Sequence, residues 1–245
     1  MNDIWIILGA SSSIAKTFTR SVAEDGAHVI LAGRRMDDLE TIAADADARG
    51  TGKAVPVKFD ARDPETFQAI LDAATAIEGT INCAVFVGSM PAQDEIDADP
   101  KLLDGVIADS LTGPARFLQM LAPKLKAQGT GSVVGVGSVA GDRGRVGNYV
   151  YGAAKSGFAT YLSGLRNALG RHGVHVLTVK PGPVDTAMTQ GLGPQPFITT
   201  TEAVVADIHK ALSKKRNTLY TKWIWWPVMT VIKLIPEPIF KKMSI

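Results

Sequence analysis

Short apolar segments alternate with longer segments of helical pattern along most of the chain, and this alternation constrains the fold more than any other feature. Strands are expected at residues 4–8, 28–32, 54–59, 81–87, 132–137 and 174–179. Helices are expected from residue 13 to about residue 25, at 37–49, 64–77 and 149–170, and at 100–128 with a break near Gly113 and Pro114. A loop at 191–201 precedes a short helix. The sequence therefore predicts one α/β domain over residues 1–245, with helices on both faces of a doubly wound parallel sheet of the Rossmann type.

The composition fits a folded chain in a reducing compartment. Of the 245 residues, 46% are hydrophobic and 20% are charged, which argues against disorder. Cys83 is the only cysteine, which excludes an internal disulfide, and four scattered histidines give no metal-ligand spacing. The first residues form no signal peptide and no apolar run is long enough to cross a membrane. We expect a cytoplasmic protein with no bound metal and no nucleic-acid partner.

The carboxyl-terminal segment, residues 210–245, is basic and rich in tryptophan. It contains eight Lys or Arg residues against a single acid, Glu237, although the whole chain has a net charge of only +2. Within it, residues 223–235 have only Thr230 and Lys233 as polar residues. As a helix this stretch would span about 20 Å, too short for a hydrocarbon core of about 30 Å. Two interpretations stay open, namely contact with a membrane interface and packing over a pocket or a neighbouring subunit.

The turn after the first strand is made of small residues, and its position suits a nucleotide. A turn of this kind lets backbone amides and the dipole of the next helix meet a pyrophosphate. Small residues also serve ordinary tight turns, so the position in a βαβ unit is what favours the nucleotide. The candidate cofactor residues here are Gly9, Ser11, Ser12, Ser13 and Ile14.

The ends of the next two strands indicate which nucleotide binds. Gly33 stands where an acid would bind a ribose 2′-hydroxyl, and Arg34 and Arg35 follow it. Two guanidinium groups suit a 2′-phosphate, so NADP(H) is favoured over NAD(H), the alternative being solvated surface arginines. Asp60, with Ala61 after it, is placed to contact an adenine, or is a simple turn aspartate.

Tyr151 and Lys155, with Ser138 upstream, form the candidate catalytic group. Four residues of helix place the phenol and the ammonium on one face, about one turn apart. A cation beside a phenol favours the phenolate and lowers its pKa. Ser138 follows the strand at 132–137, where open α/β sheets bind ligands. Most such Tyr and Lys pairs are unrelated, but Ser138 and the nucleotide turn together favour catalysis.

These motifs resemble the short-chain dehydrogenase/reductase family over nearly the whole chain. The resemblance includes the segment from Lys180 to Thr186, which implies that Pro181, Gly182, Val184 and Thr186 lie near the nicotinamide, with Val87 and Gly88 also at the cofactor. It implies an oxidoreductase that works on a small molecule as a homo-oligomer, a dimer or a tetramer. Ser138, Tyr151 and Lys155 would then be catalytic, and Lys155 would also hold the nicotinamide ribose.

Three departures from the family pattern are present. Ser13 and Ala15 stand at glycine positions of the first turn. The family's Asn-Asn-Ala-Gly after the fourth strand is Val85-Phe86-Val87-Gly88. The asparagine that often completes the proton relay aligns with Ser110, which puts a water-linked relay to Lys155 in doubt.

Within the family, two segments resemble the decaprenylphosphoryl-2-keto-ribose reductases. They are the residues from Ser138 to Tyr151, and a tail that contains Trp226, Pro227 and Ile235. This likeness favours a keto-sugar on a polyprenyl phosphate as the substrate and a peripheral membrane location. The alternatives are a soluble reductase of a small hydrophobic ketone or alcohol, and a nucleotide-binding regulatory protein without turnover.

Overall fold

The computed structural model describes residues 2–189 and 193–243 and contains one seven-stranded sheet. The strand order is β3-β2-β1-β4-β5-β6-β7, and every neighbouring pair is parallel. The order reverses between β1 and β4, which is where an open α/β sheet binds its ligand. The strands are β1 (Asp3–Leu8), β2 (His28–Gly33), β3 (Ala54–Lys58), β4 (Thr80–Val85), β5 (Ser132–Val136), β6 (His175–Pro181) and β7 (Thr218–Thr221).

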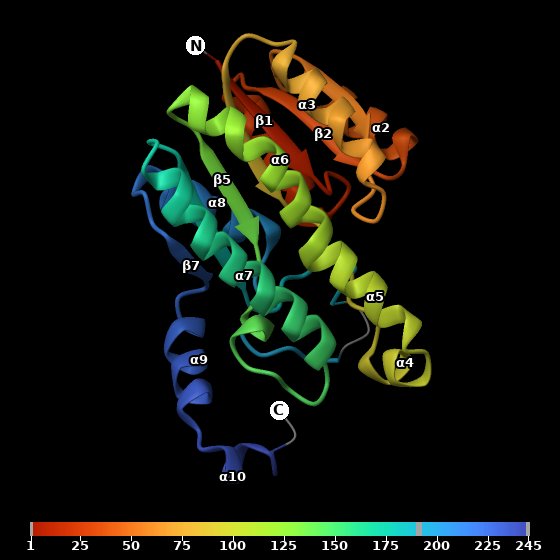
Figure 1. Ribbon diagram of the computed structural model, residues 1–245, viewed down its shortest axis with the longest axis vertical. Coiled ribbons are helices and arrows are strands. Elements are labelled where there is room, and N and C mark those ends of the chain that lie inside the picture. Colours follow the sequence, from red (N-terminus) through yellow and green to blue (C-terminus); the bar gives the residue numbers. More distant parts are fainter. Residues whose placement is uncertain (1, 190–192, 244–245) are drawn as a thin grey trace.

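Helices cover both faces of the sheet, as predicted. Figure 1 shows α6 and α7 crossing one face with α8 behind the sheet. The main helices are α1 (Ser13–Glu24), α2 (Met36–Ala48), α3 (Phe67–Thr75), α6 (Gly113–Gln128), α7 (Tyr149–Gly170) and α8 (Thr201–Ser213). The shorter ones are η1 (Pro64–Thr66), α4 (Gln93–Ala98), α5 (Lys101–Ile107), η2 (Ala108–Thr112), η3 (Val139–Asp142), α9 (Trp225–Leu234) and α10 (Glu237–Phe240).

The predicted strands and helices are found, together with short elements that were not predicted, including η3 and α10. The expected helix at 100–128 consists of α5, a π-helical turn η2 and α6, so the break lies just before Gly113. That glycine packs so closely on Ala61 that a Cβ would lie 2.2 Å from the Ala61 carbonyl oxygen. Helix α4 and strand β7 were not predicted. The first two residues of the expected loop at 191–201 lie outside the described residues, and 193–200 form no helix or strand.

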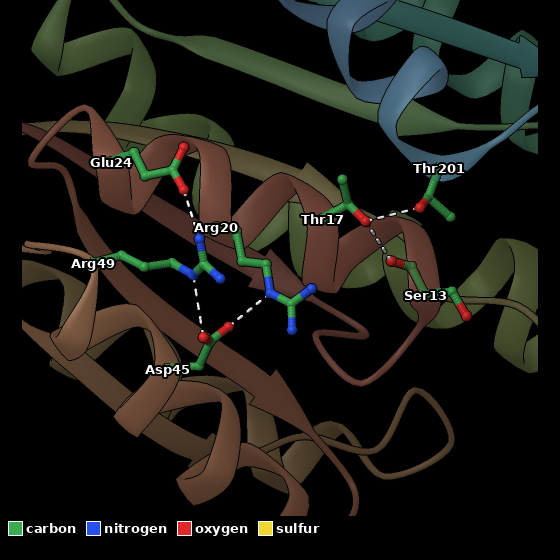
Figure 2. Close-up of polar contacts among 7 residues, drawn as sticks. All are labelled: Ser13, Thr17, Arg20, Glu24, Asp45, Arg49 and Thr201. Atoms are coloured by element: carbon green, nitrogen blue, oxygen red, sulfur yellow. Dashed lines mark hydrogen bonds and ion pairs between the residues drawn. The ribbon is translucent and has the colours of Figure 1, made fainter.

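Each face of the sheet has its own hydrophobic core, and polar contacts tie α1 to α2 and to α8. Phe18 of α1 packs with Leu39 of α2 and Ile208 of α8. Phe67, Phe117 and Phe158 fill the opposite face. Figure 2 shows Arg20 and Arg49 sharing Asp45, at 2.7 Å and 3.1 Å, while Arg49 also meets Glu24. Figure 2 also shows Thr17 donating to Thr201 at 2.9 Å, which ties α1 to α8.

The basic segment from residue 210 onward begins within α8 and then contributes β7 to the edge of the sheet. Helices α9 and α10 follow, and in Figure 1 they lie beyond the carboxyl ends of the strands. Trp225 and Met229 of α9 are buried against Val139 of η3. Among the described residues, no helix is both long and apolar enough to span a membrane.

Candidate active site

A cavity of about 700 Å³ lies at the carboxyl ends of β4, β5 and β6 and extends from the start of α1 to α9. Its two ends are lined differently. The helix end, as we name it, has Ser11 to Ile14, Val87, Gly88 and the segment from Pro181 to Thr186. The tail end has Met90, Arg145, Asn148, Met188, Phe197, Trp225, Val228 and Ile232. Ser138, Tyr151 and Lys155 line the same cavity.

The helix end presents the amino terminus of α1 to the cavity. The Ser12 hydroxyl caps this helix by accepting a hydrogen bond from the Ala15 amide at 3.3 Å. Gly9 has a φ of +77°, and a Cβ on it would lie 3.1 Å from the backbone of Phe86 and Val87. A side chain there would therefore crowd the backbone that follows β4, and the positive φ also favours glycine. Backbone amides at the start of α1 fit the negatively charged phosphates of a dinucleotide.

Five of the predicted cofactor residues lie outside the cavity wall, namely Gly9 and the four at the ends of β2 and β3. Arg34 and Arg35 are exposed at the end of β2, and Arg35 forms an ion pair with Asp38. Asp60 accepts a hydrogen bond from the Arg62 amide at 2.9 Å, and its own amide donates to Thr66 at 3.1 Å. These contacts match the turn-aspartate alternative for Asp60. Ala61 is buried against Gly113, and its cofactor role stays a prediction.

The segment after β6 forms the floor of the cavity between its two ends. Val184 is buried and bridges to Thr199, so this segment is held by the strand-like region before α8. The Thr186 hydroxyl donates to the Val184 carbonyl at 3.3 Å. A Cβ on Gly182 would lie 2.0 Å from Nε1 of Trp225, so only glycine lets the indole of α9 pack here. Pro181, Gly182, Val184 and Thr186 therefore border the cavity, and their contact with a nicotinamide stays a prediction.

Ser138, Tyr151 and Lys155 come together from two places in the fold, the end of β5 and the start of α7. Ser138 follows β5, and its hydroxyl accepts from the Ala140 amide at 3.1 Å, which orients it at the start of η3. Tyr151 and Lys155 lie in the first turns of α7, and both are buried. The Lys155 ammonium donates to the carbonyls of Val87 at 3.2 Å and Val136 at 3.1 Å, at the ends of β4 and β5. It lies 5.8 Å from the centre of the Tyr151 ring.

The acidities of this group differ from the sequence-based expectation. Burial raises the pKa of Tyr151 to about 12, and the hydrogen bond with Ser138 acts in the lowering direction. Burial also lowers the pKa of Lys155 to about 8. The prediction that Lys155 lowers the pKa of the phenol was wrong for this arrangement, because the ammonium is directed at two carbonyls and desolvation dominates. At neutral pH Tyr151 is a protonated phenol and therefore a proton donor.

Ser110 lies beside this group without lining the cavity. It is fully buried in the π-helical turn η2, and its hydroxyl accepts from the Ser89 amide at 3.4 Å. A Cβ on Gly88 would lie 3.0 Å from Nζ of Lys155 and 3.2 Å from Oγ of Ser110, so both side chains approach the side of Gly88 where a larger residue would carry its Cβ. The bidentate ion pair of Arg62 with buried Asp109 holds η2 in place. A relay through Ser110 stays a prediction.

Sequence reasoning did not single out Arg145, Asn148 or Phe197 at the tail end. Packing over a pocket, one of the two interpretations of residues 223–235, agrees with the structure, because Trp225 lines the cavity. Arg145 and Asn148 stand in the loop before α7. Phe197 and Trp225 meet edge to face with ring centres 5.8 Å apart, although 28 positions separate them. Only the folded chain brings these residues together. No cluster of His, Cys, Asp or Glu that suits a metal occurs within the described residues.

Comparison with known proteins identifies the family. The family described as short chain dehydrogenase matches residues 3–196. The chain belongs to the short-chain dehydrogenase family. An uncharacterised oxidoreductase of Mycobacterium tuberculosis is 32% identical over 239 residues, which cover 97% of this chain and 96% of that protein. This short-chain dehydrogenase is thus an oxidoreductase.

Solved structures show the same fold. A short-chain dehydrogenase from Burkholderia cenocepacia in complex with NADP has a TM-score of 0.83 and 19% identity, and covers 98% of this chain and 97% of its own. One from Sphingobium yanoikuyae in complex with NADPH has a TM-score of 0.81 and 21% identity, with 97% of each chain covered. The cavity of the present short-chain dehydrogenase lies where such a fold binds a dinucleotide, at the reversal of strand order.

Proposed function

We propose that this short-chain dehydrogenase reduces a ketone to an alcohol with NADP(H). The observation that supports this most strongly is that Ser138, Tyr151 and Lys155 border one cavity with the amino terminus of α1. When bound, NADPH supplies the hydride for the carbonyl carbon. The residues of the chain then have to hold the nucleotide, orient the carbonyl and provide a proton.

The helix end holds the nucleotide in this proposal. Amides at Ser13 and Ile14, in the first turn of α1, receive the pyrophosphate, and Val184 and Thr186 bind the nicotinamide carboxamide. Lys155 holds the nicotinamide ribose, because its ammonium is already fixed between β4 and β5. Arg34, which is exposed at the end of β2, binds the 2′-phosphate, whereas Arg35 is paired with Asp38.

Tyr151 provides the proton and Ser138 orients the carbonyl. The phenol donates its proton to the carbonyl oxygen as negative charge develops there. Ser138 donates a hydrogen bond to the same oxygen, and a prepared donor of this kind stabilises the developing charge. Since burial raises the pKa of Tyr151 to about 12, the phenol carries its proton at neutral pH, which is the form that reduction of a carbonyl needs.

Single-turnover oxidation of NADPH with a panel of ketones tests this function. The proposal expects substrate-dependent loss of the reduced-nicotinamide absorbance with at least one ketone. Tight NADPH binding without turnover on any ketone, including lipid-linked keto-sugars, would favour the alternative of a nucleotide-binding regulatory protein.

The substrate we propose is a keto-sugar on a polyprenyl phosphate. The likeness to decaprenylphosphoryl-2-keto-ribose reductases in the loop before α7 and in the tail supports it, as does the largely apolar tail end of the cavity. A small hydrophobic ketone is the rival substrate. Competing the two in the turnover assay discriminates them, since the proposal expects the lipid-linked keto-sugar to have the higher kcat/KM.

We further propose that α9 and α10 contact the inner face of a membrane in a cytoplasmic homo-oligomer. Trp223 and Trp226 are 77% and 62% exposed, and lysines at 222, 233, 241 and 242 surround them. Tryptophan beside lysine suits an interface with anionic lipid. Flotation with anionic liposomes tests this, comparing the whole chain with Trp223→Ser/Trp226→Ser. Those substitutions leave buried Trp225 in place, whereas a truncation after Lys222 would remove it. Equal flotation of both proteins would contradict the membrane contact.

A further inference from the structure

Arg145 is a cation in the wall of the cavity, and no hydrogen-bond partner for its Nε atom is found in the part of the chain that the structure describes. It stands in the loop between η3 and α7, and it lines the cavity together with Asn148 and Tyr151. Its Nε atom is buried and has no hydrogen-bond partner among the described residues. Burial lowers the pKa of Arg145, which means that the surroundings disfavour its charge. A partly buried guanidinium without a hydrogen-bond partner destabilises a free protein, so a bound anion that pairs with it would relieve this cost.

Asp142, the acid whose charge acts on Arg145, already has other hydrogen-bond partners. Asp142 attracts the guanidinium only through space. The carboxylate of Asp142 accepts from Nζ of Lys180 at 2.5 Å and from the Tyr220 hydroxyl at 2.6 Å. These two bonds tie η3 to β6 and β7. Asp142 is therefore part of the framework and leaves Arg145 uncompensated.

The neighbouring Arg143 shows what a structural arginine in this loop looks like. Its guanidinium donates to the carbonyl oxygens of Ile232 at 2.7 Å and Ile235 at 2.6 Å, and it forms an ion pair with Glu237 at 2.9 Å. It also lies 3.7 Å from the centre of the Phe240 ring. Arg143 thus fastens α9 and α10 to the catalytic loop. Arg145 has no such contacts, although it comes only two residues later.

The surroundings of Arg145 indicate what its partner is. The side-chain oxygen of Asn148 is likewise buried without a partner among the described residues, so two polar groups face the cavity near Tyr151. Beyond them the wall is apolar, with Met188, Phe197 and Trp225. One cation followed by an apolar wall fits a molecule that has an anionic group next to an apolar chain.

We propose that Arg145 binds the anionic group, a phosphate or a carboxylate, of an amphipathic substrate whose apolar part lies against Phe197 and α9. This inference rests on the proposed function, because it assigns the tail end of the cavity to the substrate. The guanidinium forms charge-assisted hydrogen bonds with the anion. The side-chain oxygen of Asn148 accepts a hydrogen bond from a hydroxyl of the same molecule. The anion thereby fixes the distance between the reacting carbonyl and Tyr151.

Calorimetric binding of three matched probes tests the proposal. Octyl phosphate, octanoate and octanol share one apolar chain, so they separate phosphate, carboxylate and neutral head groups. Each is titrated into the full chain with saturating NADPH and again without it. NADPH fills the site for its own phosphates, so binding in its presence reports on the tail end. We expect at least one anion to bind more tightly than octanol. Arg145→Gln should lower the affinity for that anion by roughly ten- to a hundred-fold and leave the affinity for octanol unchanged.

A matched control and a stability measurement separate binding from folding. Arg171 is exposed at the end of α7, and Arg171→Gln should leave all three affinities unchanged. Because Arg145→Gln removes an unpaired buried charge, its melting temperature should equal or exceed that of the wild type. Any of three results would overturn the proposal. The wild type binds neither anion more tightly than octanol, Arg145→Gln lowers the affinity for octanol as much as that for the anion, or Arg145→Gln has a lower melting temperature than the wild type. Failure of the proposed function has a different signature, since NADPH binding or turnover would then be absent in the wild type.

Discussion

The helix end and the tail end of the cavity differ in what builds them and in how much of each the sequence specifies locally. The helix end consists of small residues and backbone amides at the ends of β1, β4 and β6, within a rigid sheet. The tail end consists of long side chains from the loop before α7, from the segment before α8 and from α9. Backbone amides fit a phosphate-containing group of fixed shape, whereas long side chains determine which substrate fits. Under the proposed function, this difference implies that the helix end binds the cofactor and the tail end sets the substrate specificity.

Tyr151→Phe tests the junction of the two ends and has the largest expected effect. The substitution keeps the ring and removes the proton donor. Turnover should fall by roughly 10²- to 10⁴-fold, the range for lost general acid catalysis. NADPH binding should change little, because the phenol belongs to the catalytic step. Steady-state kinetics and calorimetry with NADPH measure the two quantities, and near-normal turnover would remove Tyr151 from its assigned role.

Trp225→Ala tests whether the tail end is a packed wall. Trp225 is 6% exposed and contacts the floor at Gly182, so truncation leaves a cavity. The free energy of unfolding should fall by about 3–5 kcal/mol. Trp226→Ala is the matched control, since Trp226 is 62% exposed and its loss should change stability by no more than about 0.5 kcal/mol. Equal losses in urea unfolding would contradict the packing described for α9.

Lys155→Met sharpens the comparison at the point where the two ends meet. Burial lowers the pKa of Lys155 from its usual 10.5 to about 8, so between these pH values the unfolded chain binds a proton that the folded protein has released. The stability linked to this pKa is absent below about pH 8 and is gained as pH rises. The free energy of unfolding of the wild type, relative to Lys155→Met, should rise by about 1 kcal/mol per pH unit from pH 8 to 10.5. A difference that stays constant with pH would show that the ammonium is not desolvated.

Much of the helix end could be predicted because its signals are local. The turn from Gly9 to Ser13, the end of β5 at Ser138 and the one-turn spacing of Tyr151 and Lys155 each depend on a few consecutive residues. Parallel pairing then places strand ends together at one edge. The acidity of Tyr151 was not predictable in this way. It depends on how deeply α7 is buried and on the carbonyls that hold Lys155, which are contributed by β4 and β5.

The tail end could not be predicted because its contacts join distant parts of the chain. Strand β7 is only four residues long and is specified by pairing with β6. The burial of Trp225, in contrast to exposed Trp223 and Trp226, depends on Gly182 and Val139. The sequence shows three similar tryptophans and cannot rank them. Arg143 and Arg145 are likewise equivalent in the sequence, and only the fold gives partners to the first and a cavity to the second.

Binding isotherms of Arg34→Ala and Arg145→Gln with the same ligands test most directly whether the two ends work separately. Arg34→Ala should weaken the binding of NADPH by about 1.5–3 kcal/mol more than the binding of NADH, which is the range for a hydrogen bond to a charged group. It should leave the binding of octyl phosphate and octanoate unchanged. Arg145→Gln should weaken the binding of whichever of those two anions the wild type binds more tightly than octanol. It should leave the binding of NADPH unchanged. If either variant weakens both classes of ligand to a similar extent, or if Arg34→Ala weakens NADPH and NADH equally, the division of the cavity into a cofactor end and a specificity end is wrong.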